Sequence, residues 1–368
     1  MRTCILLLLA LMVGASGARA DEGPAIRFAT FNAALNAREA GGVLSRLEGG
    51  DAQARAVAEL IQRLRPDVLL LQELDRDAAG RSLAVFSRDY LAVSQNGAAP
   101  IDYPFTLYPP SNTGVPLGVD VDGDGLVGGP GDARGFGHHA GQYAFALLSR
   151  LPLGAPRTFA NLLWRDVPGG LIPASYYGPE ARAVLPLSSK THLVVPVETA
   201  AGPVHVLAAH PTPPVFDDAR DWNGRRNSDE IRLLADIIDG AAYLVDDGGV
   251  AGGLPAGAPF VVMGDLNADP ERGEAREGAI AQLLGHARVA DPRPASPQHG
   301  TATAEFGGGL RVDYVLPSRN AGRVAASGVV WFAEDDAHAA LNGASDHRMV
   351  YVDLVPGADA DAGAAVAQ

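Results

Sequence analysis

Cysteine is almost absent from this sequence, which has a single one, Cys4, in 368 residues. Residues 1–20 join a basic start at Arg2 to an apolar run and to small residues at Ala18 and Ala20, the pattern of a signal peptide cleaved after residue 20. We therefore expect export, either secreted or periplasmic, with no disulfide to stabilise the chain, because Cys4 leaves with the peptide. No cysteine stands at the cleavage point, which argues against a lipoprotein.

Basic residues are also scarce. Lys and Arg number 29 against 43 Asp and Glu, and loss of Arg2 and Arg19 with the peptide would change the formal net charge from -14 to -16. Sequence-independent binding to duplex nucleic acid takes most of its affinity from Lys and Arg side chains. Small phosphoesters, or polyanions approached through bound divalent cations, therefore fit this chain better as ligands than bare nucleic acid.

Long apolar runs are missing after residue 20. No stretch there reaches the about 18 uninterrupted apolar residues of a transmembrane helix, so we expect no stable membrane insertion. Shorter apolar runs bounded by turn residues predict strands. These strands cover residues 26–31, 67–71, 143–148, 193–197, 204–209, 310–316, 329–332 and 349–354, with another that begins at Phe260.

Three helices are predicted between these strands. One follows Asp51 and has an apolar stripe, one lies near residues 277–284, and one begins at Asn227, because Asn227 with Glu230 three residues later is typical of a helix N-terminus. The simplest organisation is one α/β domain over residues 21–355, with inserted loops at about 110–140 and 211–230. The tail, residues 356–368, is rich in Ala, Gly and Asp, and we expect it to be disordered.

Polar side chains stand at the ends of several predicted strands. The segment 260–270, FVVMGDLNADP, presents Asp265 and Asn267 together at a turn, where they can align a water and hold a phosphoryl oxygen. An Asp-x-Asn turn that only satisfies its own backbone is the alternative. The other strand-end residues are Asn32, Glu73, His210, Asp346 and His347, and Asp313 lies within the 310–316 strand. If they converge, the site is rich in oxygen ligands, which favours Mg²⁺ or Mn²⁺ over structural zinc.

Five short motifs occur in a fixed order: TFN at 30–32, LQE at 71–73, GDLN at 264–267, RVDYVL at 311–316 and SDH at 345–347. In these motifs the sequence resembles the endonuclease/exonuclease/phosphatase superfamily of metal-dependent, deoxyribonuclease I-like phosphoesterases, in the form of its secreted bacterial members. The resemblance covers nearly all of the chain after residue 20. It implies a four-layer α/β sandwich, with two packed mixed β-sheets flanked by helices.

The resemblance also assigns roles at the metal. Glu73 is implied as the main ligand of Mg²⁺ or Mn²⁺, with Asn32 and Asp346 close to the metal or the phosphate. Asp265 is implied to orient or deprotonate the attacking water, and Asn267 to donate to a phosphoryl oxygen. Some relatives have a second acid at the position of Ala34, which leaves the number of metal ions open.

Two histidines complete the implied site. His347 would contact the scissile phosphate, with Asp313 holding its ring in the right tautomer. His210 matches the position of a leaving-group acid in extracellular nuclease relatives, and a histidine satisfied within the core is the alternative. The disulfides of some secreted nuclease relatives are absent.

A separate acidic motif, DVDGDG at 120–125, has the opening pattern of a calcium loop, with Asp120, Asp122 and Asp124 at alternate positions. The twelfth position is Gly131 instead of Glu, and Asp132 follows it. We interpret the motif as an irregular Ca²⁺ loop, with a solvated acidic turn as the alternative.

Basic residues that could bind phosphate lie elsewhere. Arg225 and Arg226 follow Trp222 in FDDARDWNGRRN, where guanidinium groups beside a helix N-terminus can hold a phosphate. Ion pairs of these arginines with the preceding aspartates are the alternative. Arg182 and Lys190 are further candidates.

Together these features predict an exported, divalent-metal-dependent phosphoester hydrolase that uses in-line attack by water. A phosphodiester substrate is favoured over a monoester, because His210 offers an acid for an alkoxide leaving group. Nuclease activity without sequence specificity is the leading form, because the family members most similar in these motifs cut nucleic acid. A phosphatase, or an enzyme for phospholipids or inositol phosphates, is the alternative. A hypothesis of another class is a non-catalytic, calcium-dependent binding protein, and no obligate protein partner is evident.

Overall fold

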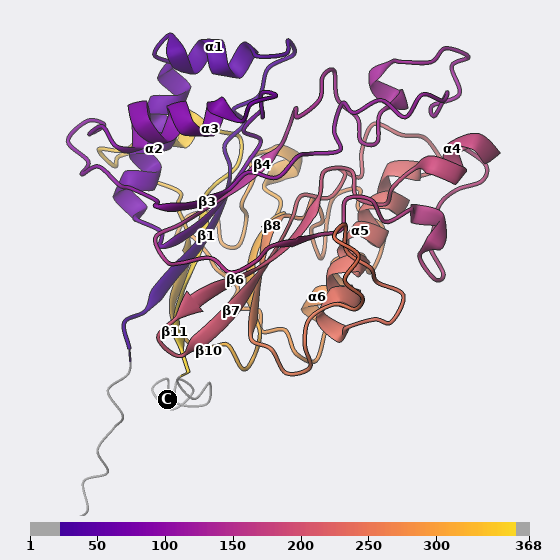
Figure 1. Ribbon diagram of the computed structural model, residues 1–368. Coiled ribbons are helices and arrows are strands. Elements are labelled where there is room, and N and C mark those ends of the chain that lie inside the picture. Colours follow the sequence, from indigo (N-terminus) through magenta and orange to yellow (C-terminus); the bar gives the residue numbers. More distant parts are fainter. Residues whose placement is uncertain (1–22, 358–368) are drawn as a thin grey trace, which may run out of the picture.

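Two β-sheets lie face to face at the centre of the molecule (Figure 1). The computed structural model describes residues 23–357. The first sheet has six strands in the order β10-β11-β1-β2-β4-β3. These strands are β1 (Ile26–Asn32), β2 (Val68–Gln72), β3 (Phe105–Leu107), β4 (Phe145–Ser149), β10 (Gly322–Val329) and β11 (Val350–Pro356). The predicted signal peptide, and the predicted tail beyond Gly357, lie outside the described residues.

The second sheet has five strands in the order β5-β6-β7-β8-β9. These strands are β5 (Arg157–Thr158), β6 (His192–Thr199), β7 (Gly202–Ala209), β8 (Phe260–Asp265) and β9 (Asp313–Pro317). Both sheets are mixed, because β1 pairs parallel with β2 and β7 pairs parallel with β8, whereas the other pairs are antiparallel.

Successive side chains of a strand point to opposite faces of its sheet, so one set packs between the two sheets and the other packs under the helices. In β1 and β2, Phe28 and Leu70 face the second sheet, and they share an apolar cluster with Val206 of β7 and Met263 of β8. Phe31 of β1 points to the opposite, outer face and packs against the helices. Since both faces of both sheets are covered, these strands read as almost continuously apolar runs in the sequence.

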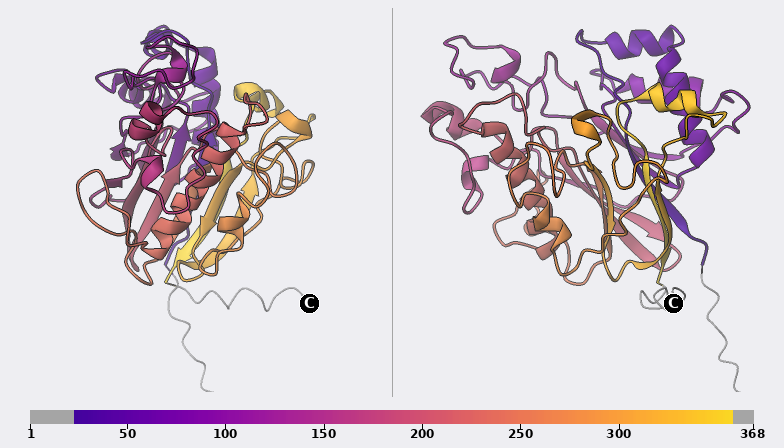
Figure 2. Two further views of the ribbon diagram at one scale, coloured as in Figure 1. Left: turned by 90° about the vertical axis from the view of Figure 1, so that its right-hand side faces the viewer. Right: turned by 180° about the vertical axis from the view of Figure 1, so that it is seen from behind.

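Helices cover the outer face of each sheet. The helices α1 (Gly42–Glu48), α2 (Ala52–Leu64) and α3 (Arg81–Phe86) pack on the first sheet, and α5 (Trp222–Asp239) and α6 (Ala281–Leu284) pack on the second. The two groups lie on opposite sides of the sheets (Figure 2). Asp51 caps α2 by accepting from the Ala54 N–H at 2.8 Å. The predicted four-layer α/β sandwich is therefore confirmed.

Helix α5 begins five residues earlier than the sequence indicates, so the prediction that Asn227 caps it is wrong. Asp217 accepts hydrogen bonds from the N–H groups of Asn223, at 2.8 Å, and Gly224, at 3.4 Å, and so satisfies the start of the helix from outside it. Asn227 is instead buried inside the helix. The loop after β7 therefore ends at residue 221, and the rest of the predicted insertion, 222–230, is helical.

Other elements are short. The helix α4 (Pro179–Val184) and a π-helical turn, Ser87–Leu91, were not predicted. The predicted strand 329–332 is wrong in position: β10 ends at Val329 and begins at Gly322. It is an edge strand with exposed Ala325 and Ala326, which gives it little apolar signal. No helix among residues 23–357 is long and apolar enough to cross a membrane.

Candidate active site

Six strand ends meet at one edge of the sandwich. The first sheet brings the ends of β1 and β2 beside the start of β11, and the second brings the ends of β7 and β8 beside the start of β9. Asp265 and Asp313 are direct cross-strand partners in β8 and β9. The residues that these ends carry are Asn32, Glu73, His210, Asp265, Asp313 and His347. The convergence that the sequence predicts is therefore present.

Asp265 is the centre of this cluster. Its Oδ2 accepts from Asn32 Nδ2 at 3.0 Å and lies 3.4 Å from His210 Nε2 and 3.7 Å from His347 Nε2. Its Oδ1 accepts from the Asn267 N–H at 3.0 Å, which closes the turn after β8. One carboxylate thus joins both sheets, and it is only 1% exposed.

Two imidazole groups face this carboxylate. His347 Nδ1 lies 2.9 Å from Asp313 Oδ2, which orients the ring with Nε2 toward Asp265. The N–H groups of Val312 and Asp313 donate to Thr303 Oγ1, each at 3.0 Å, and this hydroxyl fixes the start of β9. The His347 and Asp313 pair matches the arrangement that the resemblance implies.

The charges in the cluster oppose the effects of burial. Burial alone lowers the pKa of His347, but the carboxylates of Asp313 and Asp265 outweigh it and raise the pKa to about 10. Burial raises the pKa of Asp313 to about 6, although His347 acts against this shift. Burial also acts to raise the pKa of Asp265, but His347 and His210 together hold it well below its ordinary value. At pH 7 the cluster therefore contains a His347 imidazolium between two carboxylates.

His210 differs from His347. Burial lowers the pKa of His210, and the charge of Lys190 lowers it further, against the opposing effect of Asp265. Its Nε2 lies 4.0 Å from Glu73 Oε1, and its buried Nδ1 has no hydrogen-bond partner among the described residues. At neutral pH His210 is therefore a neutral imidazole that can donate from Nε2 to Asp265.

Glu73 stands at the mouth of the cluster. Its side chain is 21% exposed, and Asn36 Nδ2 donates to its Oε2 at 2.8 Å. Its backbone has a φ of 57°, in the left-handed region that residues with a Cβ rarely adopt. Ala34, Tyr143 and Asn267 also have positive φ values, so the loops at this edge hold several strained backbones, as functional sites often do.

The remaining predicted residues lie at the periphery of the cluster. Asp346 is exposed, and its Oδ1 is 3.3 Å from Ser345 Oγ. Asn267 donates from Nδ2 to the Pro211 carbonyl at 3.2 Å. One ligand atom each of Asp265, Asp313 and His347 lies within 4.8 Å of the others, but the Asp313 and His347 atoms already share a hydrogen bond. Glu73 and Asp346 are therefore the carboxylates of the site that can receive an ion from outside.

Comparison with known proteins decides the family. A family model described as the Endonuclease/Exonuclease/phosphatase family matches residues 29–347. The chain belongs to this family. Its members are hydrolases that act on phosphoester bonds.

Solved structures of the endonuclease/exonuclease/phosphatase family share the fold. The crystal structure of an endonuclease/exonuclease/phosphatase from Beutenbergia cavernae DSM 12333 is 20% identical, covers 91% of this chain and 72% of its own, and has a TM-score of 0.53. Sphingomyelinase C from Streptomyces griseocarneus is 18% identical, covers 90% of this chain and 100% of its own, and has a TM-score of 0.50. Identities this low show the fold alone. No curated protein matches the sequence.

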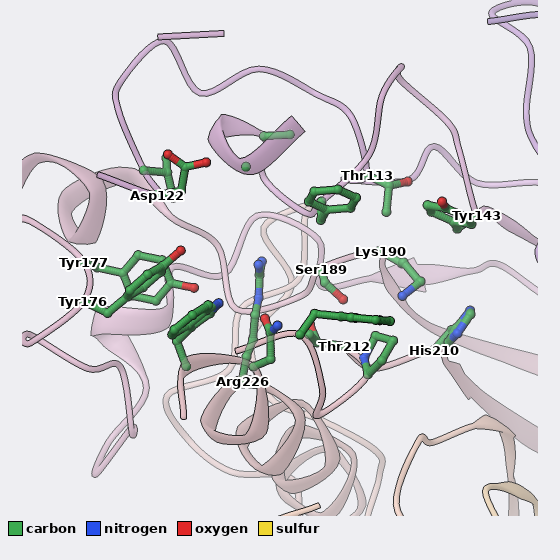
Figure 3. Close-up of a pocket in the computed structure, with 18 of the residues that line it drawn as sticks. Thr113, Asp122, Tyr143, Tyr176, Tyr177, Ser189, Lys190, His210, Thr212 and Arg226 are labelled. Atoms are coloured by element: carbon green, nitrogen blue, oxygen red, sulfur yellow. The ribbon is translucent and has the colours of Figure 1, made fainter. Parts of the chain in front are cut away.

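The acidic loop lies apart from the strand-end cluster around Asp265. It is near one end of a pocket that Glu73 also lines, as the position of Asp122 shows (Figure 3). One oxygen each of Asp120, Asp122 and Asp124 lies within 4.8 Å of the others, but the same side chains accept hydrogen bonds from backbone N–H groups of their own loop. Asp132 is buried, and it accepts from the N–H groups of Val121, Gly128 and Gly129. Asp132 thus folds the loop, and the calcium interpretation stays a prediction.

The candidate phosphate-binding arginines do not gather in the cluster. Arg226 is buried in α5 and donates to the carbonyls of Leu187, Pro186 and Arg134. Arg225 Nε donates to the Arg220 carbonyl at 3.1 Å, and Arg182 lies in α4. Arg225 and Arg226 lie inside the first turns of α5, so the premise that they precede the helix is wrong. Of the three, Arg226 lines the pocket next to Glu73.

Sequence reasoning missed several residues that hold the site in place. Asn36 fixes Glu73, and Thr303 fixes Asp313. Glu230 accepts from Ser189 N–H and Oγ and from the Thr212 N–H, so it ties the loops after β7 and before β6 to α5. Asp75 accepts from the N–H groups of Ala37 and Tyr143. These contacts join loops that are far apart in sequence, and no local pattern reveals them.

Proposed function

We propose that this protein is an exported, divalent-metal-dependent phosphoester hydrolase that acts on phosphodiesters by in-line attack of water. The observation that carries the proposal is the cluster in which Asp265 accepts from Asn32 at 3.0 Å and lies within 3.7 Å of both His210 and His347. At this spacing the site offers one reacting phosphoryl group a base from its acids, a hydrogen-bond donor from its amide and a cation from its imidazoles.

The chain has donors that suit a hard cation, Mg²⁺ or Mn²⁺. Glu73 presents a partly exposed carboxylate that Asn36 holds at 2.8 Å, and Asp346 adds an exposed carboxylate nearby. When bound there, such an ion would neutralise charge on the phosphoryl group. Calcium in the Asp120 loop would be a separate, structural ion.

The three central residues then have separate roles in the reaction. Asp265, whose pKa lies below its ordinary value, stays ionised, orients the attacking water and accepts the proton that this water releases. His347, whose pKa is raised to about 10, is the imidazolium of the site and stabilises negative charge on the phosphoryl oxygens. His210 is neutral at pH 7, and its single Nε2–H donates to Asp265, so the leaving-group oxygen takes its proton from solvent water.

Hydrolysis assays test this proposal. Purified protein is given bis(p-nitrophenyl) phosphate, p-nitrophenyl phosphate or plasmid DNA, each with Mg²⁺, Mn²⁺, Ca²⁺ or EDTA. We expect metal-dependent hydrolysis of the diester, and its loss in Asp265→Asn but not in Asp166→Asn, which removes an exposed surface carboxylate. If no substrate is hydrolysed with any metal, the proposal fails, and the calcium-dependent binding protein becomes the better reading.

A further inference from the structure

A large pocket continues from the active site into the inserted loops. It has a volume of about 720 Å³, and Glu73 and His210 form part of its wall. Figure 3 shows His210 at one end of the pocket. Asp122, Tyr176 and Tyr177 lie at the opposite end from Lys190 and His210. Pockets of this size hold small organic ligands. A phosphoester at Glu73 would therefore extend its organic group into this space.

The wall of the pocket is unusually aromatic. Six of its nineteen lining residues are Phe, Tyr or Trp, although these make up 6% of the chain. The aromatic residues are Phe136, Tyr143, Tyr176, Tyr177, Phe216 and Trp222. Aromatic faces favour flat, unsaturated partners, with which they stack.

Three of the six aromatic residues, Tyr176, Tyr177 and Trp222, are held in place by contacts with one another. Tyr176 and Trp222 are stacked, with ring centroids 4.0 Å apart and an interplanar angle of 2°. Tyr177 meets the edge of Tyr176 at 4.7 Å and that of the buried Trp164 at 5.8 Å. This part of the wall is fixed before binding, so it loses little conformational entropy when a ligand arrives.

Polar groups also line the pocket. Thr212 Oγ1 has no hydrogen-bond partner among the described residues, and Asn223 Nδ2 donates to the Val215 carbonyl at 2.7 Å. Both residues line the pocket. A heterocyclic ring has apolar faces for the aromatic wall and polar edges for such groups.

The charges of the pocket fix the orientation of the ligand. Lys190 is buried at the active-site end, where its charge interacts with those of Glu73, Glu230 and Asp265. Burial lowers the pKa of Lys190, and the three carboxylates oppose that shift. When protonated, Lys190 can bind a phosphoryl oxygen. The formal net charge of -14 disfavours a long polyanion. A ligand with one or two phosphoryl groups is compatible with both the Lys190 charge and the negative net charge of the chain.

We propose that this pocket binds the base of a nucleotide-sized phosphoester, with the ring against Trp222 and the phosphoryl group between Lys190 and Glu73. The proposal rests on the proposed function in placing the phosphoryl group at Glu73. It adds the substrate class: a single nucleotide unit, recognised without sequence preference, because stacking on an aromatic face accepts any base.

Inhibition of diester hydrolysis by AMP and ribose 5-phosphate, which differ by the base, tests this proposal. In Mg²⁺ we expect the inhibition constant of AMP to be about tenfold below that of ribose 5-phosphate. Trp222→Ala should remove this difference by weakening AMP alone. Phe216 is 90% exposed, so Phe216→Ala should leave folding intact, and it should weaken AMP about threefold by removing one stacking face. Phe105→Ala, an exposed aromatic on β3, is the matched control and should change neither constant.

Two results would overturn the proposal: equal inhibition by AMP and ribose 5-phosphate, or stronger inhibition by phosphocholine or an alkyl phosphate than by AMP. Failure of the proposed function is a different result, because the wild-type protein would then hydrolyse no phosphoester. In that case calorimetric titration of the wild-type protein with AMP and ribose 5-phosphate still decides the pocket. Tenfold tighter binding of AMP would support it, and equal binding would refute it.

Discussion

The active-site edge and the pocket beside it are built in different ways. Asp265, Asp313 and His347 lie on or directly beside paired strands, and each is at most 6% exposed. The pocket wall comes from loops and the start of α5, where Phe136 is 61% and Phe216 is 90% exposed. Strand register fixes the reacting groups, whereas loops that tolerate change shape the space for the substrate. We therefore expect chemistry and selectivity to respond separately to substitution.

The largest expected effect is on turnover at the strand edge. Asp265→Asn and His347→Ala should each lower kcat for the diester by about 10² or more, because each removes a charged group that faces the reacting phosphoryl group. Both side chains are buried in the charged cluster, so the thermal unfolding midpoint should also fall, and kcat is compared at a temperature at which circular dichroism shows each variant to be folded. A variant that keeps most of its activity would show that the cluster is not the catalytic centre.

A smaller effect is expected at Glu230, which lies where the active-site edge and the pocket meet. Glu230 accepts three hydrogen bonds from Ser189 and Thr212, so Glu230→Gln should lower the free energy of unfolding by about 2 kcal/mol. Denaturant unfolding measures this loss. Thr212 and Ser189 line the pocket, so the inhibition constant of AMP should also rise. Unchanged stability would mean that α5 does not position these loops.

The pKa of His347 tests the charge state assigned to the active-site edge. The folded-state pKa of about 10 lies above the ordinary value of about 6.5. The stability that this proton contributes is therefore fully present below about pH 6.5 and is lost as the pH rises through about 10. We expect NMR to show a protonated His347 ring at pH 8, and Asp313→Asn to bring the pKa toward 6.5. A wild-type pKa near 6.5 would contradict the assigned imidazolium.

The smallest expected effect concerns the acidic loop. If Asp122 and Asp124 hold Ca²⁺, replacing both with Ala should lower the unfolding midpoint by a few degrees in calcium and leave it unchanged in EDTA. Thermal scans in both conditions provide the measurement. An equal loss in EDTA would mean that these carboxylates only organise their own turn.

The sequence predicts the strand edge better than the loops, for a physical reason. Buried strands are short apolar runs, and a polar residue at the end of such a run is conspicuous, as Glu73 and Asp265 are. The start of α5 was misplaced because its cap, Asp217, lies outside the helix and leaves no cap pattern at the helix start. The aromatic wall was also missed as a unit, because Tyr176 and Trp222 meet only through tertiary structure. Their types were visible in the sequence, but their stacking was not.

The central claim is that the strand edge uses a divalent cation, held by Glu73, to hydrolyse phosphodiesters. The most direct measurement is the rate of bis(p-nitrophenyl) phosphate hydrolysis against Mg²⁺ concentration, for the wild-type protein and Glu73→Gln. The account predicts a saturable dependence on Mg²⁺ in the wild-type protein, and in the variant a rate at least about 10² lower or a requirement for far more Mg²⁺. Identical curves, or wild-type activity that persists in EDTA, would contradict it.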